Sequence, residues 1–199
     1  MSRWPDDARE RLEAAAFELF AIQGYDATTV TQIAERAGLN RATFFRQFAD
    51  KREVVFGGEN RVSDALTDGI RLAPPESSIM ERLQSAFVNA DEVLTPEQRL
   101  KSRQRVGALA SSVEVQERGL LKRSRMSASV AQAFLDAGFD DFDARLAAEI
   151  GMLTFSIAME RWLSADASPF SDVAIASLSE VASRASRLSS GSIRDAGVE

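Results

Sequence analysis

Apolar residues recur three and four positions apart along almost the whole chain, which is the spacing of an amphipathic helix. Leu12, Ala16, Leu19 and Phe20, for example, fall on one face of a segment that is otherwise largely polar. No stretch of any length alternates apolar and polar residues with the period of a β-strand. The pattern therefore predicts an all-α fold of about nine helices.

Glycine, proline and helix-capping residues divide this pattern into segments. The predicted helices span residues 7–23, 30–37, 41–48, 51–72, 77–93, 95–111, 113–137, 142–165 and 171–188. Two adjacent glycines, Gly57 and Gly58, lie inside the fourth segment, where each lowers helix stability by about 1 kcal/mol relative to alanine. They indicate either a flexible joint or close packing against another helix. The polar tail, residues 190–199, is predicted to be disordered.

The segment from Thr29 to Phe48 has the pattern of two short helices joined by a tight turn. Thr29 and Asn40 are residue types that cap helix N-termini, and Gly38 is the type that ends a helix in the left-handed conformation. Phe44 and Phe48 are four residues apart and share an inward face. This layout is typical of a helix-turn-helix, which places its second helix in the major groove of DNA.

The residues of this motif that do not face the core are candidates for DNA contact. Arg41, Thr43 and Arg46 are the best candidates for base edges, because they lie on the outward side of the second helix. Lys51 begins the next helix, where a cation opposes the helix dipole unless a phosphate approaches; a solvated lysine is the alternative. The residues predicted to contact DNA are Thr29, Thr31, Gln32, Arg41, Ala42, Thr43, Phe45, Arg46, Gln47 and Lys51, of which Thr29, Thr31, Gln47 and Lys51 are assigned to phosphates.

Composition excludes much enzyme chemistry. The 199 residues include no cysteine and no histidine, so disulfides, thiolate zinc sites, thiol nucleophiles and imidazole bases are excluded within one chain. Asp140 and Asp141 form a carboxylate pair, but at a position that favours capping of the following helix. We therefore expect no enzyme activity, no cofactor and no metal site.

The net charge of −6 argues against a nucleic-acid partner only if the charge is spread evenly. Between Arg36 and Arg52, however, five basic residues accompany one acidic residue, Asp50. A locally basic surface on an acidic protein allows DNA binding and keeps non-specific binding weak. No apolar run reaches membrane length and the N-terminus lacks a signal region, so we expect a cytoplasmic protein with no membrane partner.

The first third of the chain resembles the tetracycline-repressor (TetR) family of transcription regulators, over roughly residues 7–66. The residues that carry the resemblance are Phe17, Leu19, Phe20, Gly24, Thr29, Ile33, Ala34, Ala37, Gly38, Thr43, Phe45, Phe48, Lys51 and Val54. Family members usually carry a tyrosine where this chain has Phe45, and that hydroxyl commonly meets a DNA phosphate. Phe45 cannot donate, but it can pack against a sugar or a thymine methyl. The segment TFFR looks like a recurring variant within the family, so it does not indicate loss of DNA binding.

The resemblance implies a helix-turn-helix DNA-binding domain in residues 7–66 and a helical regulatory and dimerisation domain in residues 67–189. It further implies a ligand-responsive transcriptional regulator, a repressor by the family's usual mode. Such a protein binds a palindromic operator as a homodimer and is released by a small-molecule effector. Two alternatives stay open: a non-enzymatic protein-interaction module that has lost specific DNA binding, and a small enzyme that uses carboxylates and lysine.

The last two predicted helices carry apolar residues on more than one side. Residues 142–165 have two apolar stripes, one of which can face a partner chain, and residues 171–188 have apolar positions spaced alternately four and three apart. Completion of a monomeric core is the alternative. The predicted dimer interface comprises Leu146, Ile150, Leu153, Ile157, Ala174, Leu178, Val181, Ala185 and Leu188.

By resemblance, the effector pocket lies among the helices between about residues 77 and 162. Methionine and aromatic side chains there suit a largely apolar effector, although such a stripe is also typical of an ordinary core. The predicted lining residues are Phe87, Met126, Phe134, Met152, Phe155, Met159 and Trp162. No motif identifies the effector.

Overall fold

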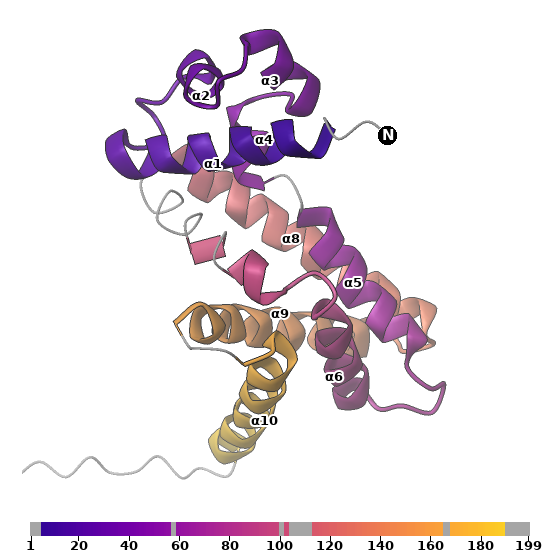
Figure 1. Cartoon of the computed structure of the whole chain (residues 1–199). Helices are drawn as coiled ribbons and strands as arrows, with labels where there is room; N and C mark the ends of the chain where they lie inside the picture. The colour runs from indigo at the N-terminus through magenta and orange to yellow at the C-terminus, as the bar shows by residue number, and fades with distance from the viewer. Residues whose placement is uncertain (1–4, 57–58, 100–101, 104–112, 165–167, 190–199) are drawn as a thin grey trace, which may run out of the picture. The chain divides into compact units, whose positions relative to one another are not determined.

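The structure is a computed structural model that describes residues 5–56, 59–99, 102–103, 113–164 and 168–189 (Figure 1). All regular secondary structure within these ranges is helical, which confirms the predicted fold class. The helices with described bounds are α1 Pro5–Gln23, α2 Val30–Arg36, α3 Arg41–Gln47, α4 Lys51–Phe56, α5 Glu59–Leu72, α6 Ile79–Ala90, α8 Val113–Asp136, α9 Asp141–Ser164 and α10 Phe170–Ser189.

Most described helix ends agree with the predicted ones to within two residues; α6 ends earlier, because the chain turns at residues 91–94. The predicted helix 51–72 has two described parts, α4 and α5. Residues 57–58, and with them the predicted joint, lie outside the described residues. Within the predicted helix 95–111, residues 96–99 and 102–103 are helical and the others lie outside the described ranges, as does the tail 190–199.

The chain forms two compact units that interleave along the sequence. The first unit consists of Met1–Val62 and Glu97–Ser124, and the second of Ser63–Pro96 and Arg125–Glu199. Helices α5 and α8 therefore each contribute residues to both units. The division into functional domains at residues 7–66 and 67–189 stays a prediction.

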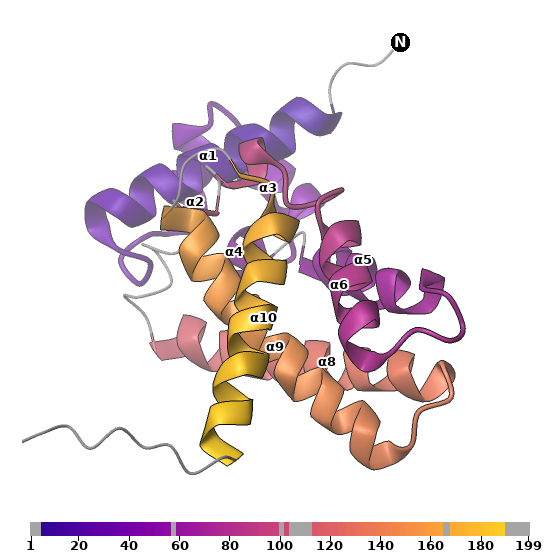
Figure 2. The ribbon, with the colours of Figure 1, turned by 90° about the horizontal axis from the view of Figure 1, so that it is seen from below.

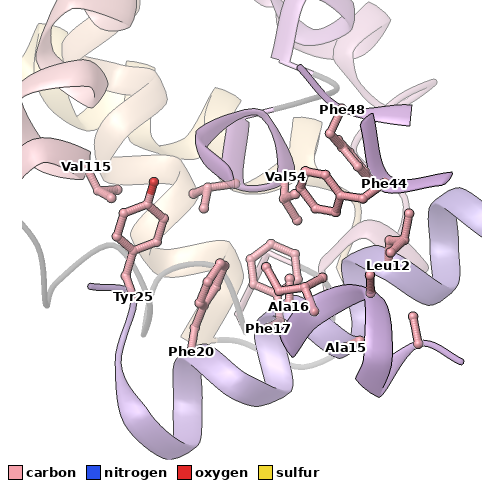
Figure 3. Packing of buried hydrophobic residues seen from close by; sticks show 14 residues of the cluster. Leu12, Ala15, Ala16, Phe17, Phe20, Tyr25, Phe44, Phe48, Val54 and Val115 are labelled. Atoms are coloured by element: carbon pink, nitrogen blue, oxygen red, sulfur yellow. The ribbon is translucent and has the colours of Figure 1, made fainter. Parts of the chain in front are cut away.

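Aromatic and aliphatic side chains fill the core of the first unit, where α1 packs against α2, α3 and α4 (Figure 3). The ring centroids of Phe20 and Tyr25 lie 5.1 Å apart. Phe44 and Phe48 are buried, as their spacing predicts. Val115, near the start of α8, lies beside Tyr25 in the same core (Figure 3), so a segment distant in sequence completes the first unit.

In the second unit α10 packs along α9 and against α6 (Figure 2). Phe170, the first residue of α10, is completely buried. The rings of Phe87, Phe155 and Trp162 surround it, with centroid distances of 6.2, 5.5 and 5.9 Å. This aromatic cluster joins α6, α9 and α10, and edge-to-face ring contacts of this kind add to the stability gained from burial.

Helices α5 and α6 approach each other backbone to backbone at Gly69. A Cβ atom on Gly69 would lie 2.6 Å from the Cα of Ala86 and 2.7 Å from the carbonyl oxygen of Ser85. Only a residue without a side chain fits this crossing without a shift of the backbone.

The buried side chain of Arg82 fixes the turn that follows α5. Its guanidinium donates hydrogen bonds to the carbonyl oxygens of Ile70, Pro74 and Pro75 at 2.9 Å and of Ser77 at 3.2 Å. A cation near a helix C-terminus is favoured by the helix dipole, and here it satisfies carbonyls that lack a helical partner.

Candidate nucleic-acid interface

Helix α3 begins at a side-chain cap that also orders its outward face. The Oδ1 atom of Asn40 accepts hydrogen bonds from the backbone N–H of Thr43 at 2.8 Å and from the Thr43 hydroxyl at 3.0 Å. That hydroxyl accepts a hydrogen bond from Nη2 of Arg46 at 2.7 Å. The prediction of Asn40 as the N-cap is confirmed, and a chain of hydrogen bonds joins the Arg46 guanidinium to it.

Helix α2 begins at a capping box. The Thr29 hydroxyl accepts from the backbone N–H of Gln32 at 3.2 Å, and Oε1 of Gln32 accepts from the backbone N–H of Thr29 at 2.9 Å. The capping role of Thr29 is confirmed; that of Gln32 was not predicted. Gly38, with φ of +66°, ends the helix in a Schellman turn in which the N–H groups of Gly38 and Leu39 donate to carbonyls of the last turn.

Two arginines of α1 bind the C-terminal ends of the motif helices. Nη1 of Arg9 donates to the carbonyl of Gln47 at the end of α3, at 3.0 Å, and Nη2 of Arg11 donates to the carbonyl of Ala37 at the end of α2, at 2.6 Å. Both contacts place a cation where the helix dipole favours it. Sequence alone does not predict this role, because no spacing within α1 indicates which distant helix end a side chain will reach.

The ammonium group of Lys51 holds the turn between α1 and α2. Its Nζ donates to the carbonyl oxygens of Tyr25 at 2.6 Å and Thr28 at 2.8 Å, and it lies 4.0 Å from the centroid of the Tyr25 ring. These contacts offset the unfavourable position of a cation at the start of α4 without a phosphate. A contact between Lys51 and a DNA phosphate stays a prediction.

Arg36 and Arg52 pair with carboxylates of the first unit. Nε of Arg36 donates to Glu18 at 2.9 Å, and this hydrogen bond lowers the pKa of the Glu18 carboxyl. Nε of Arg52 donates to Asp50 at 2.8 Å. Partial burial acts to raise the pKa of Asp50, but hydrogen bonds from Arg52 and from the backbone N–H of Glu53 outweigh it, so that pKa is lowered.

The outward side of α3 presents two guanidinium groups and one aromatic ring. Cζ of Arg41 lies 5.3 Å from the centroid of the Phe45 ring, and the same ring packs edge to face on the buried ring of Phe44 at 5.5 Å. Phe45 is nevertheless 46% exposed, and Arg41 and Arg46 are exposed. Hydrogen-bond donors beside an apolar surface are the groups that base edges in a major groove recognise.

None of the ten residues predicted to contact DNA is buried. Seven are exposed and three are partly buried, and all ten belong to α2, α3 or the residues that begin α2 and α4. The partly buried residues are Thr43, Gln47 and Lys51. Exposure makes them accessible to DNA; which of them bind it stays a prediction.

In the second unit the residues predicted for a dimer interface are exposed, partly buried or buried. Leu146 and Leu153 on α9 are 45% and 47% exposed, and Leu188 on α10 is 82% exposed. Ala174 and Leu178 have no exposed surface in the single chain, because they pack in the core, so they offer no surface to a partner. Ile150, Ile157 and Val181 are partly buried, and Ala185 is exposed.

Three residues predicted for the pocket, Phe87, Phe155 and Trp162, meet around Phe170, which was not predicted to join them. An apolar cavity of about 10 Å³ lies beside Phe87 and Met152; its other lining residues are Leu66, Ile70, Leu83, Ala86, Val130 and Gly151. This volume is about that needed by one water molecule. Met126 and Phe134 are buried and Met159 is partly buried, and none of the three lines this cavity.

Within the part of the chain that the structure describes, no three carboxylates lie close enough together to hold a metal ion. No helix in the same ranges combines the length and apolarity of a membrane span.

The family described as bacterial regulatory proteins, tetR family, matches residues 12–56, which contain the helix-turn-helix and α4. The HTH-type transcriptional regulator TcmR of Streptomyces glaucescens is 37% identical over 79 residues, which are 40% of this chain and 35% of TcmR. The HTH-type transcriptional activator FasR of Mycolicibacterium smegmatis is 35% identical over 68 residues, 34% of this chain and 31% of FasR. The chain thus spans about a third of the length of these curated relatives.

A solved structure resembles nearly the whole chain. NalD, the secondary repressor of the MexAB-OprM multidrug efflux pump in Pseudomonas aeruginosa, aligns with a TM-score of 0.58 over 92% of this chain and 97% of its own. The two sequences are 22% identical. At this identity the similarity shows a shared fold and does not identify the ligand or the regulated genes.

Proposed function

This chain is a member of the tetR family of bacterial regulatory proteins, and from this premise we propose that it is a ligand-responsive transcriptional repressor. It binds a palindromic operator as a homodimer, and a small, largely apolar effector releases it. Because its target is chromosomal DNA, it acts in the cytoplasm.

The outward face of α3 is the observation that carries the proposal. Asn40 and Arg9 hold the two ends of α3, and Thr29 and Arg11 hold the two ends of α2. All four contacts lie within the first unit and leave the face that carries Arg46 exposed. A short helix held rigidly at both ends, with one polar face uncovered, is suited to enter a groove without a cost in ordering.

The exposed apolar residues of α9 and α10 support the homodimer. Leu146, Leu153 and Leu188 would be covered by the same residues of a second chain, as a two-fold interface requires. A symmetric dimer presents two copies of α3, and these meet half-sites about 34 Å apart, one turn of the DNA helix.

The cavity beside Phe87 and Met152 supports an apolar effector, because apolar side chains line it. It has room for only about one water-sized group, so an effector must separate the helices around it. These are α5, α6, α8 and α9. Since α5 and α8 contribute to both units, a shift of either helix is a route from effector to DNA-binding unit.

Selection of binding sequences from random duplex DNA by the full chain tests DNA recognition directly. We expect an enriched palindrome whose half-site centres are about 10 base pairs, or a multiple of that, apart. A protein-interaction module would enrich no sequence and leave no footprint. Sedimentation at micromolar concentration tests the dimer, and a monomer under these conditions would contradict it.

The sign of regulation needs a separate test, because FasR is named an activator and NalD a repressor. A reporter behind the selected operator should be less active when this chain is produced and recover when the effector is added. Higher reporter activity in the presence of the chain would mean activation instead.

A further inference from the structure

We propose that Arg41 and Phe45 act as one specificity-determining unit, which reads a guanine beside a pyrimidine that carries a C5-methyl group. Thymine and 5-methylcytosine both present this methyl in the major groove. The inference rests on the proposed function and deepens it, because it names the bases that one part of the operator must contain.

The positions of the two residues favour contacts to neighbouring base pairs. Arg41 is the first residue of α3, and the N-terminal residues of a recognition helix are those that meet base edges. Phe45 follows four residues later on the same face, about 6 Å along the helix axis. Successive base pairs are about 3.4 Å apart, so two side chains offset by about 6 Å reach base pairs within two steps of each other, and adjacent base pairs lie inside this range.

The chemistry of Phe45 restricts what it can read. Its ring has no hydrogen-bond donor, so it cannot bind a phosphate as a tyrosine hydroxyl can. Phe44 packs against it at 5.5 Å and Arg41 lies at 5.3 Å from its centroid, so the ring is held in place although it is 46% exposed. The C5-methyl of a pyrimidine is the apolar group that the major groove presents to such a ring.

The contact with Phe45 also prepares Arg41 for guanine. A cation–π contact uses the charge of the guanidinium and consumes none of its N–H donors in hydrogen bonds. The guanidinium N–H groups of Arg41 therefore stay able to donate to O6 and N7 of guanine together, which is the commonest base-specific contact of arginine. Arg46 differs, because one of its N–H groups is already bonded to Thr43.

Modified bases in the selected operator test the methyl contact, because each modification removes or adds a single methyl group. Replacing each thymine in turn by deoxyuridine removes only the methyl, and replacing each cytosine by 5-methylcytosine adds only the methyl. At one thymine in each half-site, the change to deoxyuridine should weaken wild-type binding about fourfold, and about fifteenfold when both half-sites carry it. When cytosine replaces that thymine, methylation of the cytosine at C5 should strengthen binding. This result would separate the contribution of the methyl group from that of the rest of the base.

The matched variants are Phe45→Ala and Phe45→Tyr. Phe45→Ala should bind the thymine and deoxyuridine operators equally, whereas Phe45→Tyr keeps the ring and should keep the preference. Replacing the neighbouring guanine by 7-deazaguanine should weaken wild-type binding about fivefold and leave Arg41→Ala unaffected. Thermal unfolding of each variant checks that the exposed substitutions leave the first unit folded.

Two results would overturn the inference while the proposed function stands. The first is equal binding of the wild type to thymine and deoxyuridine at every position, which a contact of Phe45 with a sugar predicts. The second is a Phe45→Ala variant that keeps the wild-type discrimination, which would assign the methyl contact to another residue. If random-sequence selection enriches no operator at all, the proposed function fails and this inference falls with it.

Discussion

Within each unit, a different balance of contacts positions the helices. In the first unit, side chains such as Asn40, Arg9 and Arg11 bind the ends of short helices. In the second unit, the buried Arg82 also binds a helix end, at Ile70 in the last turn of α5, but there longer helices additionally cross backbone to backbone at Gly69. A helix that is bound at its ends keeps one side exposed and available to a partner such as DNA. A helix that is packed closely along its length has that side buried against its neighbour.

This difference separates binding from stability. The outward face of α3 contributes little to the core of the first unit, so its residues can change with little effect on the free energy of unfolding. Gly69 and Ala86, at the α5–α6 crossing, belong to other helices and are buried. Their substitution should therefore change the free energy of unfolding and not the contacts with DNA.

The largest effect on stability is expected for Arg82→Met. The methionine keeps much of the packing of the aliphatic stem but removes the Arg82 hydrogen bonds from four carbonyl oxygens, of which that of Pro74 still accepts from the backbone N–H of Ser77. The free energy of unfolding should therefore fall by about 3 kcal/mol or more. Denaturant titration measures it. Arg71→Met is the control: Arg71 pairs with Asp68 and Asp136 at the surface, and its loss should cost about 0.5 kcal/mol. Equal losses in the two variants would contradict the role of the buried carbonyl contacts.

Arg46→Ala should have the largest effect on DNA binding. If Arg46 reads a base, operator affinity should fall by about 1–3 kcal/mol, with stability nearly unchanged because the side chain is exposed. Anisotropy titration at fixed salt measures the affinity. In Arg36→Ala, which removes a cation already paired with Glu18, affinity should change much less. Unchanged binding of Arg46→Ala to every DNA sequence would exclude Arg46 as a contact.

Two glycine substitutions probe the packing of the second unit. Gly69→Ala places a Cβ atom 2.6 Å from backbone of α6, and should destabilise by about 1–2 kcal/mol after the gain in helix propensity is subtracted. In Gly151→Ala the new Cβ meets only Cδ2 of Leu83, at 2.8 Å, which a rotation of that side chain relieves. Its stability should stay within about 1 kcal/mol of the wild type. Thermal and denaturant unfolding of both variants, side by side, measure the difference; equal stabilities would mean that the α5–α6 crossing adjusts readily.

The smallest effect is expected from the pH dependence of the first unit. The pKa of Asp50 is lowered in the folded chain, so its contribution to stability is complete above the unfolded pKa of about 4 and is lost as pH falls through the folded pKa. Asp50→Asn keeps an oxygen that can accept from the backbone N–H of Glu53 but does not titrate. Its free energy of unfolding should therefore decline less than that of the wild type below about pH 4. Parallel declines would show that Asp50 is not a source of acid sensitivity.

Much of the first unit was predictable because helix caps and turns act over a few residues. Thr29 and Asn40 cap the helices that follow them, and Gly38 ends α2, because each bonds groups within five positions of itself. The inward face of Phe44 and Phe48 follows from helical periodicity in the same way.

The partners of the charged residues were less predictable. The count of charges between Arg36 and Arg52 predicted a locally basic surface, yet Arg36 and Arg52 pair with carboxylates and Lys51 donates to two carbonyl oxygens. A count of charges gives the local excess of basic residues. It does not give the partner of each basic side chain, because that depends on which side chains and carbonyl groups the other helices bring near it.

Sequence by itself determined the helices of this protein, the turn between α2 and α3, and the residues that α3 turns outward, since all of these follow from local geometry and capping. Only the tertiary structure decided that Arg9 and Arg11 hold the ends of that motif, across 38 and 26 residues of chain. It also decided that Ala174 and Leu178 lie in a core and that Gly69 touches another helix. Such contacts join segments far apart along the chain, and their energy depends on packing that no local pattern encodes.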